Sequence, residues 1–220
     1  RTVSTMTIDT WCGSESEPAL GFLDLPESGL ARGAVVICPP LGHEHVIAYR
    51  ALRLLGQELV EKGIAAFRFD YLGQGDSSGE SAVADAPDRW LRSIEESVAY
   101  LRSAGVEHVM LAGLTSGALL AAAALPRLEG IAGVVLWDPE LAGSRFIRRQ
   151  KSIHRMTVGT DDDDVAGVVP LLSLVLHDDA ARWLGEARVQ ADSVAEAKVP
   201  TLVVPRRADE ASAQLVRFRA

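Results

Sequence analysis

One stretch decides the fold: Leu111-Ala112-Gly113-Leu114-Thr115-Ser116-Gly117-Ala118-Leu119. An apolar, strand-like run leads into it from His108, and an apolar helical run leads out of it to Leu125. Strand, Gly-x-nucleophile-x-Gly and buried helix is the layout of a nucleophile elbow, a sharp turn that holds one side chain above the edge of a sheet. The positions of Gly113 and Gly117 must be small, because this turn brings strand and helix backbones close together. The position between them, where such elbows usually have serine, holds Thr115.

The chemistry of Thr115 has two interpretations. Its hydroxyl can attack an ester or thioester carbonyl if a base takes its proton. Against this, the elbow needs strained backbone angles, which β-branched residues tolerate poorly, and the extra methyl crowds the path of attack. Thr115 is therefore either a weak or unusual nucleophile or an inert remnant. Ser116 does not replace it, since a shift by one residue would put Leu114 and Ala118 where the turn needs glycines.

The composition excludes several classes of protein. The chain has 220 residues, enough for one domain with its own core, and is 48% hydrophobic and 24% charged. A net charge of −8 argues against a general nucleic-acid binder. The longest apolar runs are too short to span a bilayer, and the first residues lack the pattern of a signal peptide. We therefore expect a cytoplasmic protein in which Cys12 and Cys38 are free thiols.

Strand-like and helix-like segments alternate up to Trp137. Continuous apolar runs predict buried strands, and segments with apolar residues at helical spacing predict helices. The strands are expected at residues 34–38, 64–69 and 131–137 besides the run before the elbow, and the helices at residues 47–62 and 87–103. The segments 3–10 and 19–25 predict an antiparallel hairpin. This alternation predicts an α/β fold, with a mostly parallel sheet covered by helices on both faces.

The pattern loosens after Asp138. Residues 139–198 contain a basic stretch at 145–155, an acidic run at 161–164 and an apolar run at 168–176, and we expect them to form an inserted cap. The sheet resumes at Thr201–Val204, and a last helix is expected near Asp209. Residues 1–220 are thus expected to form one domain with a cap insertion at about 139–198.

Four motifs resemble those of the α/β-hydrolase superfamily, and most closely the serine-aminopeptidase-like hydrolases, including the exosortase A system-associated hydrolases. They are the loop Cys38-Pro39-Pro40-Leu41-Gly42-His43-Glu44, which looks like the oxyanion loop of that family, the loop from Phe67 to Ser77, the elbow, and Leu136-Trp137-Asp138-Pro139 with the basic segment after it. The resemblance covers about residues 15–210 and implies the α/β-hydrolase fold. It also implies that the final strand and helix of that fold are missing here.

The resemblance assigns further site residues. Leu41 aligns with the residue that supplies one backbone N–H of the oxyanion hole, and the N–H of Ser116, which follows the nucleophile position, is expected to supply the other. Asp209 is the best match to the catalytic acid, and Asp138 is the runner-up. The alternative roles are structural: Asp209 would cap the last helix, and Asp138 would cap the entry to the inserted segment.

The catalytic histidine has no obvious counterpart. It usually follows the acid in the chain, yet none of the five histidines follows Asp209. His43 lies beside the oxyanion loop and could reach the mouth of the pocket. A surface position is the alternative for this residue.

Together these residues predict an acyl hydrolase or acyl transferase that acts on an ester or thioester, with Thr115 as the nucleophile. The alternative is a non-hydrolytic or catalytically degenerate protein of the same fold, which binds a ligand or a carrier-bound acyl group under the cap. No metal or redox cofactor is implied, since the sequence has neither a clustered His/Cys ligand set nor a dinucleotide fingerprint after a strand.

The basic stretch suggests an acyl-group carrier as partner. Helical spacing puts Arg145, Arg148, Arg149 and Arg155 partly on one side, where they could dock a phosphopantetheine arm, coenzyme A or an acidic acyl carrier protein. The alternative is a solvated helix that pairs with the acidic run at 161–164.

Overall fold

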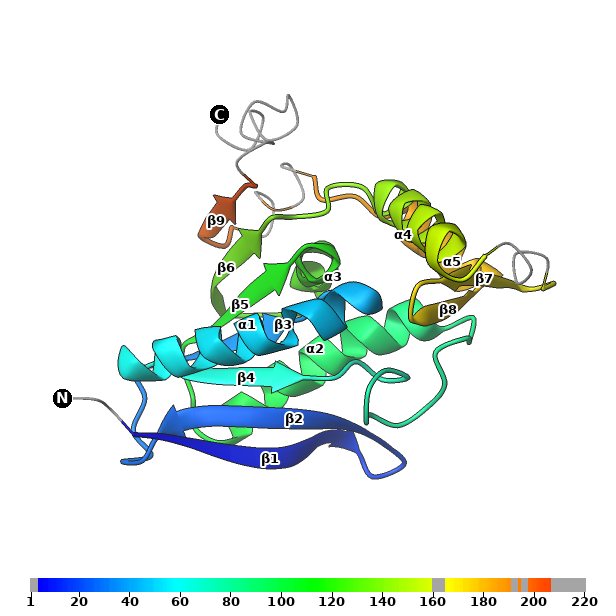
Figure 1. Cartoon of the computed structure of the whole chain (residues 1–220). Helices are drawn as coiled ribbons and strands as arrows, with labels where there is room; N and C mark the ends of the chain where they lie inside the picture. Colours follow the sequence, from blue (N-terminus) through cyan, green and yellow to red (C-terminus); the bar gives the residue numbers. More distant parts are fainter. Residues whose placement is uncertain (1–3, 160–164, 191–193, 195–197, 207–220) are drawn as a thin grey trace.

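The structure is a computed structural model and describes residues 4–159, 165–190, 194 and 198–206. Seven strands within these residues form one sheet in the order β1-β2-β4-β3-β5-β6-β9 (Figure 1). Their bounds are β1 Thr5–Ser14, β2 Glu17–Pro26, β3 Ala34–Cys38, β4 Ala65–Phe69, β5 Val109–Leu114, β6 Ile131–Trp137 and β9 Thr201–Val204.

The sheet is mostly parallel. β1 and β2 form the antiparallel hairpin that the sequence predicted, and β2 pairs antiparallel with β4. The remaining neighbours, from β4 through β3, β5 and β6 to β9, all pair in parallel. Parallel neighbours need crossover connections, which here contain the helices. The predicted α/β architecture is therefore confirmed.

Helices cover both faces of the sheet. Successive strand residues point to opposite faces, and in β3 Val35 and Ile37 pack with α1 (His43–Glu61), whereas Ala34, Val36 and Cys38 join the larger cluster on the other face. That larger cluster includes residues of α2 (Ala86–Ser103) and α3 (Ser116–Ala124). A short 3₁₀ turn, Leu125–Arg127, follows α3.

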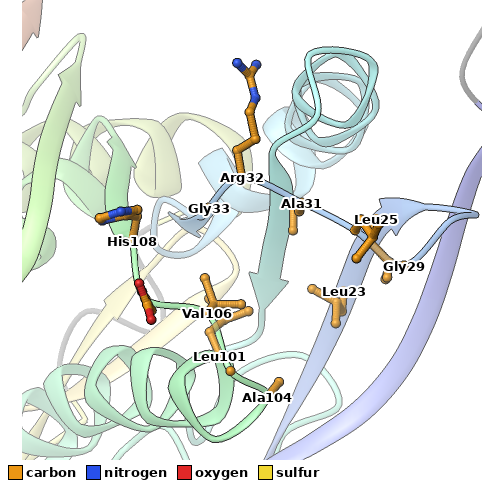
Figure 2. A pocket seen from close by; sticks show the side chains of 14 residues that line it. Leu23, Leu25, Gly29, Ala31, Arg32, Gly33, Leu101, Ala104, Val106 and His108 are labelled. Atoms are coloured by element: carbon orange, nitrogen blue, oxygen red, sulfur yellow. The ribbon is translucent and has the colours of Figure 1, made fainter.

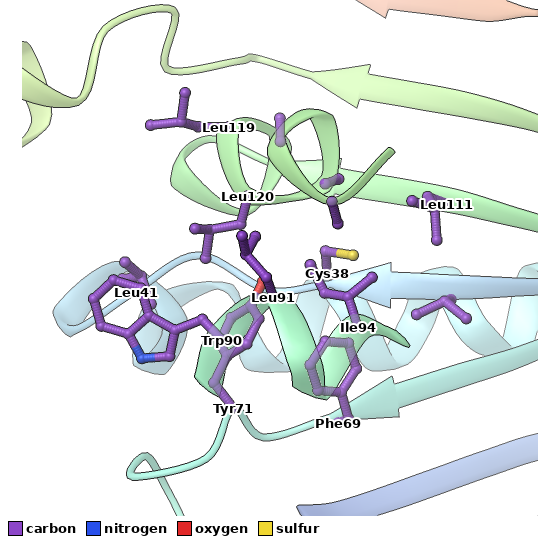
Figure 3. Packing of buried hydrophobic residues seen from close by; sticks show 14 of the residues in the cluster. Cys38, Leu41, Phe69, Tyr71, Trp90, Leu91, Ile94, Leu111, Leu119 and Leu120 are labelled. Carbon is purple, nitrogen blue, oxygen red and sulfur yellow. The ribbon is translucent and has the colours of Figure 1, made fainter. Parts of the chain in front are cut away.

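The larger cluster anchors the loop that follows β3. The side chain of Leu41 is fully buried in this cluster together with Trp90, Leu119 and other large side chains (Figure 3). Burying a leucine side chain stabilises a fold by about 1.5–3 kcal/mol. The buried hydroxyl of Tyr71 donates a hydrogen bond of 3.1 Å to the carbonyl oxygen of Pro39. Backbone and side chain of this loop are thus both tied to the core.

Between β6 and β9 lie four further elements. They are α4 (Gly143–Thr157), β7 (Val168–Leu171), β8 (Leu174–His177) and α5 (Asp178–Glu186). β7 and β8 form a separate antiparallel pair, and α4 packs on α5 beyond the carboxyl ends of the parallel strands (Figure 1). The segment expected to be a cap therefore has its own small structure, and its role as a cap stays a prediction.

The structure differs from the sequence expectation at one position that matters for the site. α1 begins at His43 rather than at Ile47, because Gly42 adopts φ 62° and turns the chain directly into the helix. Glu44 consequently lies in the first turn of α1.

Two other expectations concern the cysteines and the membrane. Cys12 and Cys38 are free thiols, as expected; both are buried, and burial raises the pKa of Cys12 to about 11. In the described part of the chain, no helix has both the length and the apolar character that crossing a bilayer requires.

Candidate active site

Thr115 occupies the turn between β5 and α3. Both flanking glycines are required there: a Cβ on Gly113 would lie 2.4 Å from the Cα of Ala118, and a Cβ on Gly117 would lie 2.2 Å from the carbonyl oxygen of Cys38. The turn therefore brings the start of α3 against both β5 and the loop after β3. This is the geometry of a nucleophile elbow.

The backbone of Thr115 is strained. It has φ 50° and ψ −113°, outside the regions that β-branched residues favour, and such an outlier costs about 1–3 kcal/mol. Backbone hydrogen bonds hold it in place: the N–H of Thr115 donates to the carbonyl of Trp137 at 3.0 Å, and its carbonyl accepts from the N–H of Glu140 at 3.0 Å. The surrounding fold thus imposes a conformation that threonine itself disfavours.

The hydroxyl of Thr115 is hydrogen-bonded to a carboxylate. It donates to Oε2 of Glu44 at 2.8 Å. The other oxygen of Glu44, Oε1, accepts from the guanidinium of Arg149 at 2.6 Å and from the side-chain amide of Gln150 at 2.9 Å. Glu44 therefore lies between the elbow and α4, with each of its two oxygens bonded to a different side of the site.

Arg149 connects Glu44 to a second carboxylate. Its guanidinium also donates to Oε2 of Glu140 at 2.6 Å, and Glu140 is only 5% exposed. Burial raises the pKa of Glu140 in spite of the neighbouring Arg149. Burial alone would lower the pKa of Arg149, but the carboxylates of Glu44 and Glu140 outweigh burial, so the pKa of Arg149 is raised.

The sequence interpretation assigned no role to Glu44, Glu140, Arg149 or Gln150 at the elbow. The one local signal for Glu44 is an acidic residue at the end of the Cys38–Glu44 motif. The elbow contact also requires that α1 begins at His43, which the sequence pattern did not predict.

The two expected oxyanion residues lie together. The N–H of Leu41 donates to the hydroxyl of Ser116 at 2.9 Å, and Ser116 is fully buried. Ser116 is also the first residue of α3, so its own N–H has no partner within the helix. One expected donor is thus occupied by a side chain of the protein, whereas the other belongs to a helix N-terminus.

The expected acids and histidine lie elsewhere or outside the described residues. Asp138 accepts hydrogen bonds from Arg206, after β9, at 3.0 Å from Nε and also from a terminal nitrogen. Asp209 lies outside the described residues, as does the expected last helix. His43 is half-buried at the start of α1, and its imidazole has no hydrogen bond within the described residues. His45 lies 3.7 Å from Asp70.

Three buried polar atoms on α4 have no partner within the described residues. They are Oε1 of Gln150 and both ring nitrogens of His154. These residues are one helical turn apart, on the face of α4 that also reaches Glu44. Buried polar groups are normally hydrogen-bonded to protein or to water, so ordered water or another polar group is expected next to these three atoms.

The expected basic face of α4 is only partly present. Arg145, Arg148 and Arg155 are exposed, but Arg149 turns inward to Glu44 and Glu140. The acidic run at 161–164, its expected alternative partner, lies outside the described residues.

A cavity of about 420 Å³ lies at the opposite edge of the sheet (Figure 2). Its lining includes Gly33, Ala65 and His108, each directly before or at the start of a parallel strand, so it lies far from the carboxyl ends where this class of sheet binds ligands. Its arginine, Arg32, points away from the apolar lining and donates to the carbonyl of Lys62. This cavity is therefore no part of the elbow site.

Comparisons with known proteins agree with this geometry. Residues 29–158 match the family model described as serine aminopeptidase, S33. No curated protein sequence gives a significant match.

Solved structures of similar fold include Est1E from Butyrivibrio proteoclasticus with bound ferulic acid, at 20% identity over 95% of this chain and 84% of that chain, with a TM-score of 0.66. The proline iminopeptidase of Mycobacterium smegmatis has 15% identity over 96% and 86%, with a TM-score of 0.64. The thioesterase domain from the curacin biosynthetic pathway has 15% identity over 97% and 90%, with a TM-score of 0.59. At these identities the likeness shows the fold. Because the family model covers more than half of the sequence, the chain belongs to the serine aminopeptidase S33 family of α/β-hydrolases.

Proposed function

We propose that this protein is an acyl hydrolase or acyl transferase that acts on an ester or thioester, with Thr115 as its nucleophile. The observation that carries the proposal is the hydrogen bond of 2.8 Å from the Thr115 hydroxyl to a carboxylate, formed at the turn of the elbow. A hydroxyl becomes a nucleophile when an adjacent base takes its proton. The inert interpretation of Thr115 does not require such a partner.

The backbone around Thr115 supports the same reaction. The residue keeps a strained conformation that glycine would adopt without cost, and such strain is found most often at functional sites. The N–H groups of Ser116 and Leu41 would bind the oxyanion of the tetrahedral intermediate. For Leu41, the oxyanion has to displace the hydroxyl of Ser116. A negatively charged acceptor favours this exchange, because charge-assisted hydrogen bonds are about twice as strong as neutral ones.

The substrate class is proposed from the fold neighbours and from α4. An esterase with bound ferulic acid and a thioesterase domain share this fold, which supports a small acyl ester or thioester. The exposed Arg145 and Arg148 on α4 would favour an anionic carrier of the acyl group, such as coenzyme A or an acyl carrier protein. In this proposal the segment between β6 and β9 is the cap over the acyl group, and Asp209 and Asp138 remain the candidate acids.

Turnover of p-nitrophenyl butyrate and of butyryl-coenzyme A tests the proposal. We expect Thr115→Ala to lower turnover at least about 100-fold and Thr115→Ser to keep or raise it, because serine retains the hydroxyl without the crowding methyl. Thr201→Ala, at an exposed position of β9, is the matched control and should behave like the wild type. Equal turnover by the wild type and Thr115→Ala would refute the proposal.

The second candidate is a non-hydrolytic protein that binds an acyl ligand. The specific observation in its favour is that the Thr115 hydroxyl and the Leu41 N–H already have partners within the protein, whereas Gln150 and His154 have buried polar atoms without any among the described residues. This candidate predicts equal residual turnover by the wild type, Thr115→Ser and Thr115→Ala. It also predicts a higher Tm in the presence of a non-hydrolysable thioether analogue of butyryl-coenzyme A, since a ligand that binds only the folded state stabilises it.

A further inference from the structure

We infer that Glu44 is the general base that activates Thr115, and that Arg149 and Gln150 are positioning residues that hold its carboxylate. The inference rests on the proposed function. It assigns to a glutamate in the first turn of α1 the task that a histidine usually performs in this fold.

The geometry fits a base and its supporting groups. The distance of 2.8 Å between Oγ1 of Thr115 and Oε2 of Glu44 lies within the range of about 2.6–3.2 Å that direct proton transfer needs. Arg149 and Gln150 both bind the other oxygen, Oε1, so Oε2 faces the hydroxyl. A nucleophile, a base and a third group that orients the base form the general arrangement of nucleophilic catalysis.

The neighbouring histidines do not compete for this role. His43 and His45 flank Glu44 in α1, and successive residues of a helix point in different directions, about 100° apart. The imidazole of His45 lies beside Asp70 instead. Within the described residues, the hydroxyl of Thr115 is hydrogen-bonded to Glu44 and to neither histidine.

Arg149 belongs to a cluster of four charged side chains. Its guanidinium is shared by two carboxylates, those of Glu44 and Glu140. Arg145 lies 4.0 Å from Glu140, so the cluster contains two positive and two negative groups. Arg149 therefore holds the carboxylate of Glu44 in place, and the second carboxylate has an arginine partner of its own.

The reaction then balances through one carboxylate. As Oγ1 of Thr115 bonds to the acyl carbon, its proton moves to Oε2 of Glu44, and the carbonyl electron pair moves onto the oxyanion. When the intermediate collapses, the carbonyl re-forms, the bond to the alcohol or thiol oxygen or sulfur breaks, and Glu44 returns the proton to that leaving group. Water, or an acceptor alcohol, gives its proton to Glu44 as it attacks the acyl-threonine. The second collapse releases the acid or new ester and returns this proton to Oγ1 of Thr115.

The test compares Glu44→Gln and Glu44→Ala with the wild type in turnover of p-nitrophenyl butyrate. We expect kcat to fall about 10²–10⁴-fold in both, the usual contribution of a general base. Sodium formate, a carboxylate smaller than the side chain removed in Glu44→Ala, should restore part of the lost turnover. It should not do so in the double variant Glu44→Ala/Thr115→Ala. Glu58→Gln, at an exposed position of the same helix, is the matched control.

The positioning role of Arg149 has its own readout. Arg149→Met should lower kcat with little change in KM. Arg149→Lys should recover part of the loss, because lysine keeps the positive charge but its single ammonium group cannot bind two carboxylates with two separate nitrogens as the guanidinium does. A purely structural role would instead lower turnover in proportion to the folded fraction, which circular dichroism measures in the same samples.

The outcomes separate this inference from the proposed function. If Thr115→Ala abolishes turnover and folded Glu44→Gln retains it, Thr115 is the nucleophile and Glu44 is not its base. If formate fails to raise the turnover of folded Glu44→Ala, the inference is wrong. If the wild-type pH profile has an acid limb near pH 6.5 that Glu44→Gln retains, a histidine is the base and the inference is also wrong. Equal turnover by the wild type and Thr115→Ala overturns the proposed function itself.

Discussion

Substitution of Gly117 by alanine should push the elbow and the loop after β3 apart. A Cβ at this position would lie 2.2 Å from the carbonyl oxygen of Cys38 and 2.4 Å from that of Pro39. Ordinary contacts of this kind begin at about 3.4 Å, so the start of α3 and the loop would have to separate by roughly 1 Å. Both obstacles are backbone atoms, so no side-chain rotation relieves the contact.

The loop is also poorly able to move. Tyr71 binds the carbonyl of Pro39, and the side chain of Leu41 is fully buried. Overpacking of a core costs about 1–3 kcal/mol, and we expect Gly117→Ala to reach the upper end of this range, about 3 kcal/mol. Because Gly117 does not have a positive φ, this cost comes from the contact and not from the backbone conformation of alanine. Turnover should fall as well, since Leu41 moves away from Thr115.

Gly185→Ala is the matched control. Gly185 lies in α5, and a Cβ there would meet only Cδ1 of Ile147, at 3.6 Å. Alanine at this helical position should therefore stabilise the protein by about 0.5–1 kcal/mol. The free energy of unfolding from urea denaturation measures both variants. If Gly117→Ala is as stable as the wild type within about 0.5 kcal/mol, the packing argument for the elbow is wrong.

Two further predictions concern the surroundings of the elbow. Ser116→Ala leaves the buried N–H of Leu41 without its partner, which should lower the free energy of unfolding by about 1–3 kcal/mol. Turnover should stay the same or rise, because the oxyanion no longer competes with the Ser116 hydroxyl for this N–H. Unchanged stability in urea together with lost turnover would contradict this prediction. Burial lowers the pKa of His45 in spite of the nearby Asp70, so the folded protein binds the His45 proton less tightly than the unfolded chain does. The contribution of His45 to stability is therefore complete above about pH 6.5 and is lost as the pH falls towards the pKa of the folded state. Burial raises the pKa of Asp70, so the Asp70 contribution to stability changes with pH in the opposite direction, in the wild type and in His45→Gln alike. The test is therefore the difference in Tm between His45→Gln and the wild type, measured from pH 5 to pH 7. A constant difference would refute the prediction.

Local patterns in the sequence were sufficient to predict the arrangement of strands and helices. The apolar run of β3 and the helical spacing in α2 depend on neighbouring residues alone, since side chains alternate across a strand and recur every turn of a helix. The elbow was recognisable for the same reason: Gly113 and Gly117 mark a close approach of backbones that only glycine permits. The hairpin of β1 and β2 likewise follows from two alternating segments joined by a short turn.

The partner of Thr115 was decided by the tertiary structure. Glu44 and Thr115 are 71 positions apart in the sequence, and Arg149 is a further element away, 105 positions from Glu44. No local period links these residues, and the basic stretch of α4 gave equal reason to expect Arg149 on the exposed face. Only the packing of α4 over the carboxyl ends of the strands turns Arg149 inward, and only the start of α1 at His43 brings Glu44 to the elbow. The sequence by itself thus determined the fold and the position of Thr115 at the elbow, because both rest on short-range patterns, whereas the charges around Thr115 depend on how distant elements pack.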